Sequence, residues 1–549
     1  MSIEKSVSKF LLSKRQPKDI FLLFLLAMLL LWLPTYLKQE LNLFELGLYL
    51  PGIDAVSQGQ VPFRDFFHLR GPFELYLPTL FMKVFGFRLD VLATYFYVGT
   101  IMTMLASIII AIELIEQRIL LYSFVLILIT RTFPRVVFTC WGGMRYAWGL
   151  LAIWCLIRFL KSNRSGWLLA GGCLTAIGML TSIEIGVIVF AAFIIMIILN
   201  QEYQRRLWVF FLGFLLVILP YSTYLICQHA LMPYLQGQWI VVTHMQQTFL
   251  ELDRVPNTIP KFLHAILIPT DKSFYQMTPM YCYIFFFTLY FWRILKKNIN
   301  VLDHAAFLVA AYGLISFLTG FRKIEFVEYE MALQPEKIVL FYLLGQLVAE
   351  IPKKISTAKW LSGFLILVVF ISSVIYSVGR FNTRFYKSSW VYQLIGNKKN
   401  GKTELINGAL ETPIDLPRIK NMIIPVWQAQ DLDELQSFVD QHVPAHEAIW
   451  MYPELGSLHF LLNRPWVGRF PMVTLSWMDD QGFADYEATL EQNPPNFAIV
   501  KKEKNFYFDK TYFLVEGNRI KQDHLMQFLS QHYVIKEQTP SYLIYQRVH

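Results

Sequence analysis

Residues 45 to 85 read ELGLYLPGIDAVSQGQVPFRDFFHLRGPFELYLPTLFMKVF, and this is the stretch from which the fold of the chain is best predicted. It directly follows the first hydrophobic span of the chain. We therefore expect its charged side chains, among them Arg64, His68 and Arg70, to lie at a membrane surface rather than in bulk solvent.

The composition indicates an integral membrane protein. Of the 549 residues, 55% are hydrophobic and only 16% are charged, and the apolar residues occur in blocks. The net charge of +9 does not indicate a nucleic-acid partner, because Lys and Arg lie scattered at the ends of the apolar blocks. The five cysteines lie in or beside apolar spans, which predicts neither a disulfide framework nor a cysteine metal site.

Apolar runs of about 20 residues predict about eleven transmembrane helices. They start near residues 19, 93, 119, 146, 166, 185, 206, 277, 302, 334 and 359. The first is an anchor rather than a cleaved signal peptide, because it is long and aromatic sequence follows it closely. Residues 166 to 199 are too long a run for one helix, so the polar break at residues 181 to 184, TSIE, predicts two helices that meet in an outward hairpin.

Basic residues predict the orientation of the chain in the membrane. They precede the first span and recur in alternate connections, at residues 161 to 164, 205 to 206, 296 to 297 and 353 to 354. Since such connections stay in the cytoplasm, the N-terminus is predicted to be cytoplasmic and the C-terminus external. The predicted outward loops are residues 38 to 92, 131 to 145, 228 to 276 and 320 to 333.

The chain changes character near residue 378, where charged residues become frequent and apolar runs shorten. We predict a polytopic all-α membrane domain over residues 1 to 377 and a small extracytoplasmic α/β domain over residues 378 to 549. In the second domain, Asp431 and Glu434 have the spacing of a capping box that opens an amphipathic helix, and a second helix is predicted over residues 520 to 533. Strands are predicted at residues 448 to 452, 497 to 500 and 543 to 545.

Two short outward loops contain cations against the topological bias. These are Arg131, Arg135 and Arg145 in the first loop, and Arg322 and Lys323 in the second. A phosphate-bearing ligand at the outer membrane surface is one explanation, since guanidinium groups bind phosphate in a bidentate manner. The alternative is that they bind the headgroups of membrane lipids, or pair with carboxylates such as Glu325 and Glu328.

The first loop resembles that of the GT-C glycosyltransferases, the superfamily of the protein mannosyltransferases and the lipid A aminoarabinose transferases. Residues 59 to 66, GQVPFRDF, match the G-x-x-PYRDF segment that bacterial members often carry, and Gly71-Pro72 stands where a proline pair would follow. At the family spacing, Glu45 occupies the position of the usual catalytic Asp. Glu184 is similar to the acid at a hairpin tip of the family, and Arg322 and Pro335 fit a later family segment.

The resemblance implies an inverting membrane glycosyltransferase at the outer face of the bacterial cytoplasmic membrane. The donor would be a polyprenyl-phosphate sugar, and the acceptor an envelope glycan, lipid or protein. An acceptor hydroxyl is a poor nucleophile, so a carboxylate must take its proton, and Glu45 is the first candidate for this base. The departing lipid phosphate needs positioned cations, for which Arg145, Arg322 and Lys323 are available.

Other residues of the membrane half have two interpretations each. Asp65 is a second catalytic candidate, although it would otherwise orient Arg64, which is itself a candidate substrate contact; Asp54 is a further rival. His68 would contact substrate or would be a hydrogen-bonded structural histidine. Glu184 is a candidate substrate contact, because an ionisable group near a membrane helix end is costly unless it has a function.

Two other classes of function stay open. A transporter or flippase of saccharides would carry ionisable residues at mid-bilayer and two related halves, whereas the charges here lie mainly at span ends. A non-catalytic scaffold with an external ligand-binding domain would have an inert membrane half. The sequence contains no P-loop or Rossmann glycine pattern, and it predicts no metal site and no cofactor, although a divalent cation stays an open alternative.

Overall fold

The computed structural model describes residues 13–33, 36–132, 144–199, 201–244, 259–267, 271–320, 334–350, 411–502 and 515–548, with short pieces of 363–371. The chain divides into two compact units. Unit 1 comprises Met1–Pro34, Phe96–Leu219 and Val255–Gly396, and unit 2 comprises Thr35–Tyr95, Pro220–Arg254 and Asn397–His549. Most of the described residues are helical, and the sheet lies near the C-terminus.

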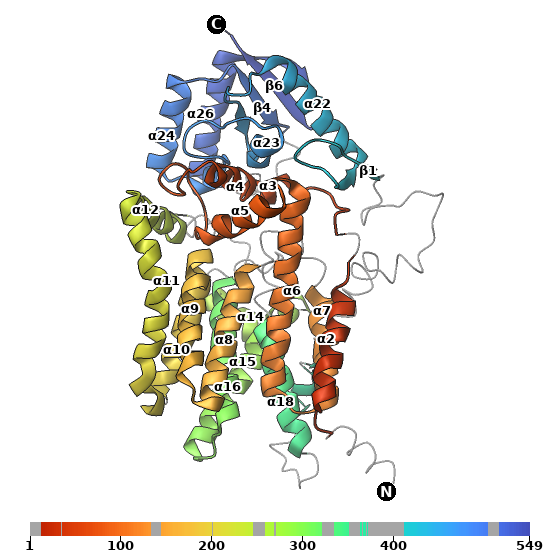
Figure 1. Ribbon diagram of the computed structural model, residues 1–549, viewed down its shortest axis with the longest axis vertical. Helices are drawn as coiled ribbons and strands as arrows, with labels where there is room; N and C mark the ends of the chain where they lie inside the picture. The colour runs from red at the N-terminus through yellow and green to blue at the C-terminus, as the bar shows by residue number, and fades with distance from the viewer. Residues whose placement is uncertain are drawn as a thin grey trace, which may run out of the picture. The chain divides into compact units, whose positions relative to one another are not determined.

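Unit 1 is built of helices (Figure 1). These are α2 (Pro17–Leu31), α6 (Leu89–Leu114), α7 (Arg118–Thr132), α8 (Met144–Ser162), α9 (Ser165–Thr181), α10 (Ile183–Leu199), η1 (Gln201–Arg206), α11 (Leu207–Cys227), α14 (Ile259–Leu267), α15 (Asp271–Leu295), α16 (Val301–Gly320) and α18 (Gln334–Glu350). The first residues of α6 and the last of α11 belong to unit 2. A helix lies at each predicted span from residue 19 to residue 334, and the span predicted near residue 359 lies mostly outside the described residues.

Three described helices are long and apolar enough to cross a membrane by length and composition: Leu89–Leu114, Tyr203–Cys227 and Val301–Thr319. Three more are apolar but shorter: Arg118–Ile129, Ser165–Thr181 and Ile183–Leu199. A helix rises about 1.5 Å per residue, so Ser165–Thr181 and Ile183–Leu199, at about 25 Å each, fall a little below the roughly 30 Å of a bilayer core, and Arg118–Ile129, at about 18 Å, falls well below it. The count of eleven transmembrane helices therefore stays a prediction.

The hairpin predicted at residues 181 to 184 is present. Helix α9 ends at Thr181, Ser182 adopts an extended backbone with φ −152° and ψ 119°, and α10 begins at Ile183. Gly186 allows the two helices to approach closely, because a Cβ atom there would lie 2.3 Å from Cβ of Met179. The polar break was therefore a correct signal for two helices rather than one.

Unit 2 combines the first loop with the C-terminal domain. The loop forms α3 (Leu43–Gly47), α4 (Leu50–Ser57) and α5 (Phe73–Phe85), and residues after α11 form α12 (Leu231–Val242). The C-terminal domain contains β1 (Glu411–Pro413), β2 (Ile423–Pro425), α22 (Val426–His442), β3 (Trp450–Tyr452), α23 (Gly456–Leu461), η4 (Leu475–Trp477), α24 (Asp480–Gln492), β4 (Phe497–Lys501), α26 (Glu516–His532), β5 (Tyr533–Gln538) and β6 (Tyr542–Arg547).

The main sheet has the strand order β3-β4-β6-β5 and carries helices on both faces (Figure 1). β3 is parallel to β4, with Trp450 opposite Ala498, and the other pairs are antiparallel. Side chains alternate across a strand, so Ala498 packs in the core with residues of α24 and α26, whereas the ring of Phe497 contacts Phe438 of α22 at 5.4 Å. This arrangement agrees with the predicted small α/β domain.

The three predicted strands are confirmed as β3, β4 and β6, and the predicted second helix as α26. The capping box at Asp431 is wrong, because α22 already begins at Val426. Asp431 is buried inside that helix, where its carboxylate accepts hydrogen bonds from the backbone N–H of Ser541 at 3.2 Å and from its hydroxyl at 2.5 Å. The same residue spacing occurs at helix starts and within helices, and only a tertiary partner distinguishes the two. Strand β5 and helix α24 were not predicted.

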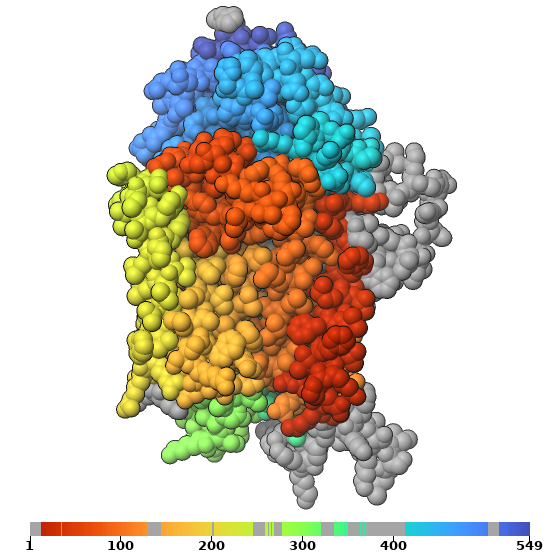
Figure 2. Space-filling model, in the orientation of Figure 1, coloured from red at the N-terminus to blue at the C-terminus, as the bar shows by residue number. Residues whose placement is uncertain are grey.

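Within unit 2 the first loop packs on the C-terminal domain. Leu41 exchanges two hydrogen bonds with the side chain of Gln428, at 2.8 and 2.9 Å. Gly47 of α3 lies against α23, since a Cβ atom there would be 2.6 Å from Sδ of Met472 and 3.1 Å from the backbone N of Ser457. Figure 2 shows the orange loop and the blue C-terminal residues as one continuous surface. The boundary predicted at residue 377 lies outside the described residues.

Candidate functional site

Arg64 and Asp65 form a fork-shaped ion pair in the first loop. Arg64 donates to Asp65 through Nε at 2.7 Å and Nη2 at 2.8 Å, and through Nη1 to the backbone oxygen of Gln228 at 3.0 Å. The Asp65 carboxylate also accepts from the N–H of Val61 at 2.7 Å. The hydrogen bond from Arg64, aided by that from Val61, holds the pKa of Asp65 below its usual range against the opposing effect of burial. Asp65 is thus ionised and occupied as an acceptor, which fits the prediction that it orients Arg64.

A hydrogen bond from Arg469 of the C-terminal domain holds the turn that contains Arg64 and Asp65. Phe63 has the left-handed φ of 70°, which is uncommon for a bulky residue. Its N–H donates to the oxygen of Phe66 at 2.8 Å, and its own oxygen accepts from Nη2 of Arg469 at 2.7 Å. A strained conformation persists only where its surroundings enforce it. The position of Arg64 and Asp65 therefore depends on a residue about 400 positions later in the chain.

Glu45 lies in the first turn of the short helix α3 and is only 4% exposed. The side chain of Asn42 caps this helix and accepts from the N–H of Glu45 at 3.2 Å. Carboxylates are rarely buried to this degree in proteins. A carboxylate buried to this degree does not serve merely to keep the end of a membrane span in water.

His68 is buried beside a charged cluster that the sequence interpretation did not identify. Arg70 donates through Nη1 to the hydroxyl of Tyr49 at 2.9 Å and to Glu74 at 3.1 Å, and the Tyr49 hydroxyl also donates to Glu74 at 2.9 Å. The spacing of four residues between Arg70 and Glu74 was the available signal. Burial, followed by the charge of Arg70, lowers the pKa of His68 to about 3, so its imidazole is neutral. Among the residues that the structure describes, Nε2 of His68 has no hydrogen-bond partner.

Unit 1 brings together two candidates that are far apart in sequence. Nη2 of Arg145, at the start of α8, lies 3.2 Å from a carboxylate oxygen of Glu184, at the start of α10. The Arg145 side chain is 6% exposed and that of Glu184 is 40% exposed. A Cβ atom on Gly149 would lie 2.8 Å from Ile185, which shows how closely the first turns of these helices pack.

Several predicted residues lie outside the described part of the chain. These are Arg322 and Lys323, together with the carboxylates Glu325 and Glu328 that were considered as pairing partners. Among the described residues, no group of three or more His, Cys, Asp or Glu has the arrangement needed to hold a metal ion. The arrangement of the described candidates is thus a buried carboxylate and a fork-shaped ion pair in unit 2, and a paired guanidinium in unit 1.

Comparison with known proteins gives the class of fold. Residues 70–226 match the family model of dolichyl-phosphate-mannose-protein mannosyltransferase. The crystal structure of ArnT from Cupriavidus metallidurans bound to undecaprenyl phosphate is similar over 97% of this chain and 99% of that chain, with 10% identity and a TM-score of 0.53. Its apo state is similar over 96% and 98%, with 10% identity and a TM-score of 0.52. A comparison with curated protein sequences gave no match.

The chain is therefore a membrane protein with the GT-C fold. The resemblance drawn from the first loop is confirmed at this level, as is the combination of a helical membrane part with a small C-terminal sheet. The archaeal oligosaccharyltransferase AglB from Archaeoglobus fulgidus, in complex with an inhibitory peptide and a dolichol-phosphate, has 9% identity over 97% of this chain and 74% of that chain, with a TM-score of 0.47.

Proposed function

We propose that this protein is an inverting membrane glycosyltransferase that moves a sugar from a polyprenyl-phosphate donor to an envelope glycan, lipid or protein. The observation that carries the proposal is the extent of the likeness to ArnT, a structure that holds undecaprenyl phosphate, since it covers 97% of this chain and 99% of that chain. The match to a mannosyltransferase family model over residues 70–226 supports the same class, and this range contains Arg145 and Glu184.

Glu45 is the proposed general base. The base must take a proton from the acceptor hydroxyl as that oxygen attacks the anomeric carbon. Burial supports this role, because a site without bulk water protects the reacting carbon from hydrolysis. Asp65 is less suited as a base, because the hydrogen bonds from Arg64 and from the Val61 N–H hold its pKa below its usual range and so weaken it as a proton acceptor. We assign Asp65 and Arg64 to positioning of the first loop.

Arg145 is the proposed contact to the donor phosphate. The ion pair with Glu184 restrains its guanidinium, and a positioned cation stabilises the charge that develops on the leaving phosphate better than a mobile one does. Arg322, Lys323 and His68 remain proposed substrate contacts. The reaction would take place at the outer face of a bacterial cytoplasmic membrane, with the N-terminus in the cytoplasm.

Donor binding tests this proposal. The purified protein in lipid nanodiscs should bind undecaprenyl phosphate, and Arg145→Ala should weaken that binding by about tenfold or more, since a charge-assisted hydrogen bond is lost. Arg158→Ala is a matched control, because Arg158 lies on the same helix and also pairs with a glutamate, Glu113, at 3.0 Å. If the Arg145→Ala protein binds undecaprenyl phosphate as tightly as the wild type, Arg145 does not contact the donor phosphate.

Sugar transfer is the second measurement. Incubation with polyprenyl-phosphate sugars and a cell-envelope extract should release free polyprenyl phosphate and label an acceptor. If the protein instead moves these lipids across a vesicle membrane without transferring sugar, the flippase alternative replaces this proposal.

A further inference from the structure

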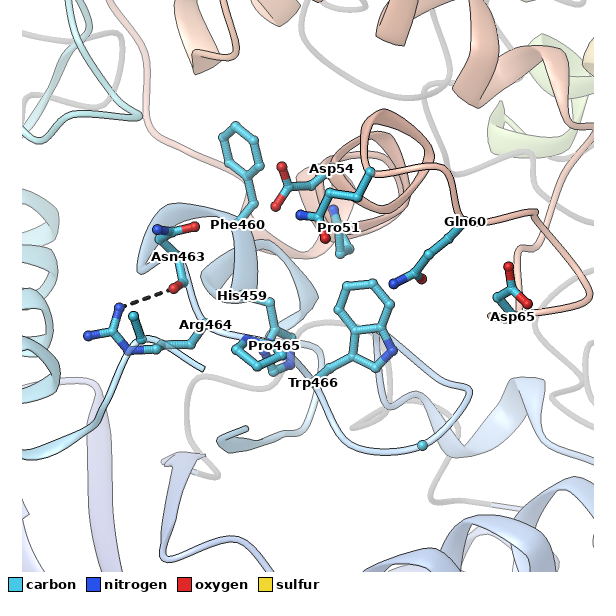
Figure 3. Close-up of a pocket in the computed structure, with 13 residues that line it drawn as sticks. Pro51, Asp54, Gln60, Asp65, His459, Phe460, Asn463, Arg464, Pro465 and Trp466 are labelled. Carbon is cyan, nitrogen blue, oxygen red and sulfur yellow. Dashed lines mark hydrogen bonds between the residues drawn. The ribbon is translucent and has the colours of Figure 1, made fainter. Parts of the chain in front are cut away.

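Unit 2 contains a groove that is separate from the proposed base Glu45, although the rival candidates Asp54 and Asp65 both line it. Its volume is about 620 Å³, which is within the usual range for a small-molecule site. Helix α4 and the residues just after it form one side, and residues 459 to 468, at and after the end of α23, form the other. Figure 3 shows Asp54 and Gln60 on the first side and Asn463 and Trp466 on the second. Glu45 does not line the groove.

Arg418 fixes the polar groups on both sides of the groove. It donates through Nη1 to Asp54 at 3.0 Å and through Nη2 to Oδ1 of Asn463 at 2.7 Å. Its guanidinium is also stacked on the ring of Phe460, 4.4 Å from the centroid. Because Oδ1 of Asn463 accepts from Arg418, the amide N–H groups of Asn463 are the atoms left for a ligand. The groove thus presents a held acceptor, the Asp54 carboxylate, and a held donor, the Asn463 amide.

A buried histidine in the wall provides an independent sign of a ligand. His459 lines the groove and is 4% exposed, and its Nδ1 has no hydrogen-bond partner among the described residues. Burial lowers the pKa of His459 to about 3, although the backbone of Arg464 and Pro465 opposes this, so the ring is neutral. An unsatisfied buried polar atom is costly, and a ligand hydroxyl would remove that cost.

Trp466 gives the groove a fixed aromatic surface. Its ring is half-buried and packs edge-to-face against Phe66 and His459, each with centroids 6.2 Å apart. Phe66 and His459 thus fix the orientation of the large apolar ring, which lies in the same groove as the Asp54 carboxylate and the Asn463 amide.

The charges of the groove favour an uncharged ligand. Asp54 is paired with Arg418 at 3.0 Å, Asp65 with Arg64 at 2.7 Å, and Arg464 with Asp440 at 3.4 Å. With each acid matched by an arginine, neither a phosphate nor a metal cation gains a net electrostatic attraction.

We propose that this groove binds a neutral oligosaccharide. Sugar hydroxyls both donate and accept hydrogen bonds, as Asn463, Asp54 and the neutral His459 require, and the C–H face of a pyranose ring stacks on an aromatic side chain such as Trp466. The groove would hold a glycan outside the site of sugar transfer. The inference goes beyond the proposed function, because binding here needs neither a donor nor turnover.

The test measures binding of neutral oligosaccharides to the purified full-length chain in nanodiscs, with no donor present. The probes are three- to six-unit oligomers of glucose, galactose, mannose and N-acetylglucosamine, observed by saturation-transfer NMR and titration calorimetry. We expect at least one to bind. Asn463→Asp should weaken that binding by about tenfold, because it removes the N–H donors while keeping the acceptor for Arg418. Trp466→Ala should do the same through loss of stacking.

Two further variants separate binding from folding. Gln60→Ala removes a side chain that lines the groove, and it should reduce affinity several-fold while unfolding stays that of the wild type. Trp427→Ala removes an exposed tryptophan elsewhere on unit 2 and should leave affinity unchanged. Absence of binding by every probe, or binding that the Asn463, Trp466 and Gln60 variants leave unaltered, would overturn the inference. Since no donor is used, that outcome does not contradict the proposed transfer reaction. Conversely, a protein that fails to transfer sugar does not contradict glycan binding in the groove.

Discussion

Replacing Glu45 by Gln should abolish most sugar transfer while the fold stays intact. The substitution keeps the shape of the side chain and its place in α3, but the amide does not accept a proton. General-base catalysis contributes about 10²- to 10⁴-fold to a rate, so turnover should fall on the order of 100-fold or more, which is about 2.7 kcal/mol or more of transition-state stabilisation. Glu45→Asp should retain part of the activity, because the carboxylate is present but shorter.

Asp65→Asn is the matched comparison in the same loop. Its amide oxygen can still accept from the Val61 N–H, while one of the two hydrogen bonds from Arg64 is lost. The two side chains are 36% and 29% exposed, so solvent screens the pair and the loss should be about 1 kcal/mol or less. Such a loss corresponds to at most about a fivefold decrease in rate. The rate of sugar transfer by the Asp65→Asn protein should therefore exceed that of the Glu45→Gln protein by at least about twentyfold.

The assay is single-turnover sugar transfer from a polyprenyl-phosphate sugar, with thermal unfolding of each variant as the control for folding. An active Glu45→Gln protein beside a dead, folded Asp65→Asn protein would show that the base is misassigned. Full activity in both variants would mean that the first loop is not catalytic, and the transporter and scaffold alternatives would return.

Three further outcomes are expected. Because only the unfolded state binds a proton at His68 between its folded pKa of about 3 and the ordinary 6.5, this histidine should lower the stability by up to about 1.4 kcal/mol per pH unit below pH 6.5. His459 has a similarly lowered pKa, so in a melting series from pH 7 to 4 His68→Gln should reduce the slope by up to that amount and leave the part due to His459. Gly186→Ala should destabilise unit 1 by about 1 to 3 kcal/mol through contact with Met179, whereas Gly166→Ala, where a Cβ atom meets nothing within 4 Å, should be neutral or stabilising in a thermal-unfolding comparison. Reporters fused after residue 400 should give an external signal, and a cytoplasmic signal would contradict the predicted topology.

Local patterns predicted most of the elements. Hydrophobic runs predicted the helices of unit 1, and alternating apolar runs predicted β3, β4 and β6, because burial and side-chain periodicity act over a few residues. The same reasoning found the α9–α10 hairpin from three polar residues, Thr181, Ser182 and Glu184, in an apolar run. It failed at Asp431, where a capping signature lies inside α22, because the contact with Ser541 that explains this acid is about 110 residues away.

The sequence by itself determined the membrane class of this protein, the resemblance of its first loop and the identity of Glu45 as a candidate base. Only the tertiary structure decided which charges meet: Arg145 with Glu184 across 39 residues, and Asp54 with Arg418 across 364. Likewise, it joined the first loop to the C-terminal domain in unit 2 and so formed the groove around Trp466. The reason is physical: hydrophobicity and local geometry are properties of neighbouring residues, whereas these two ion pairs and this groove exist only when distant parts of the chain pack together.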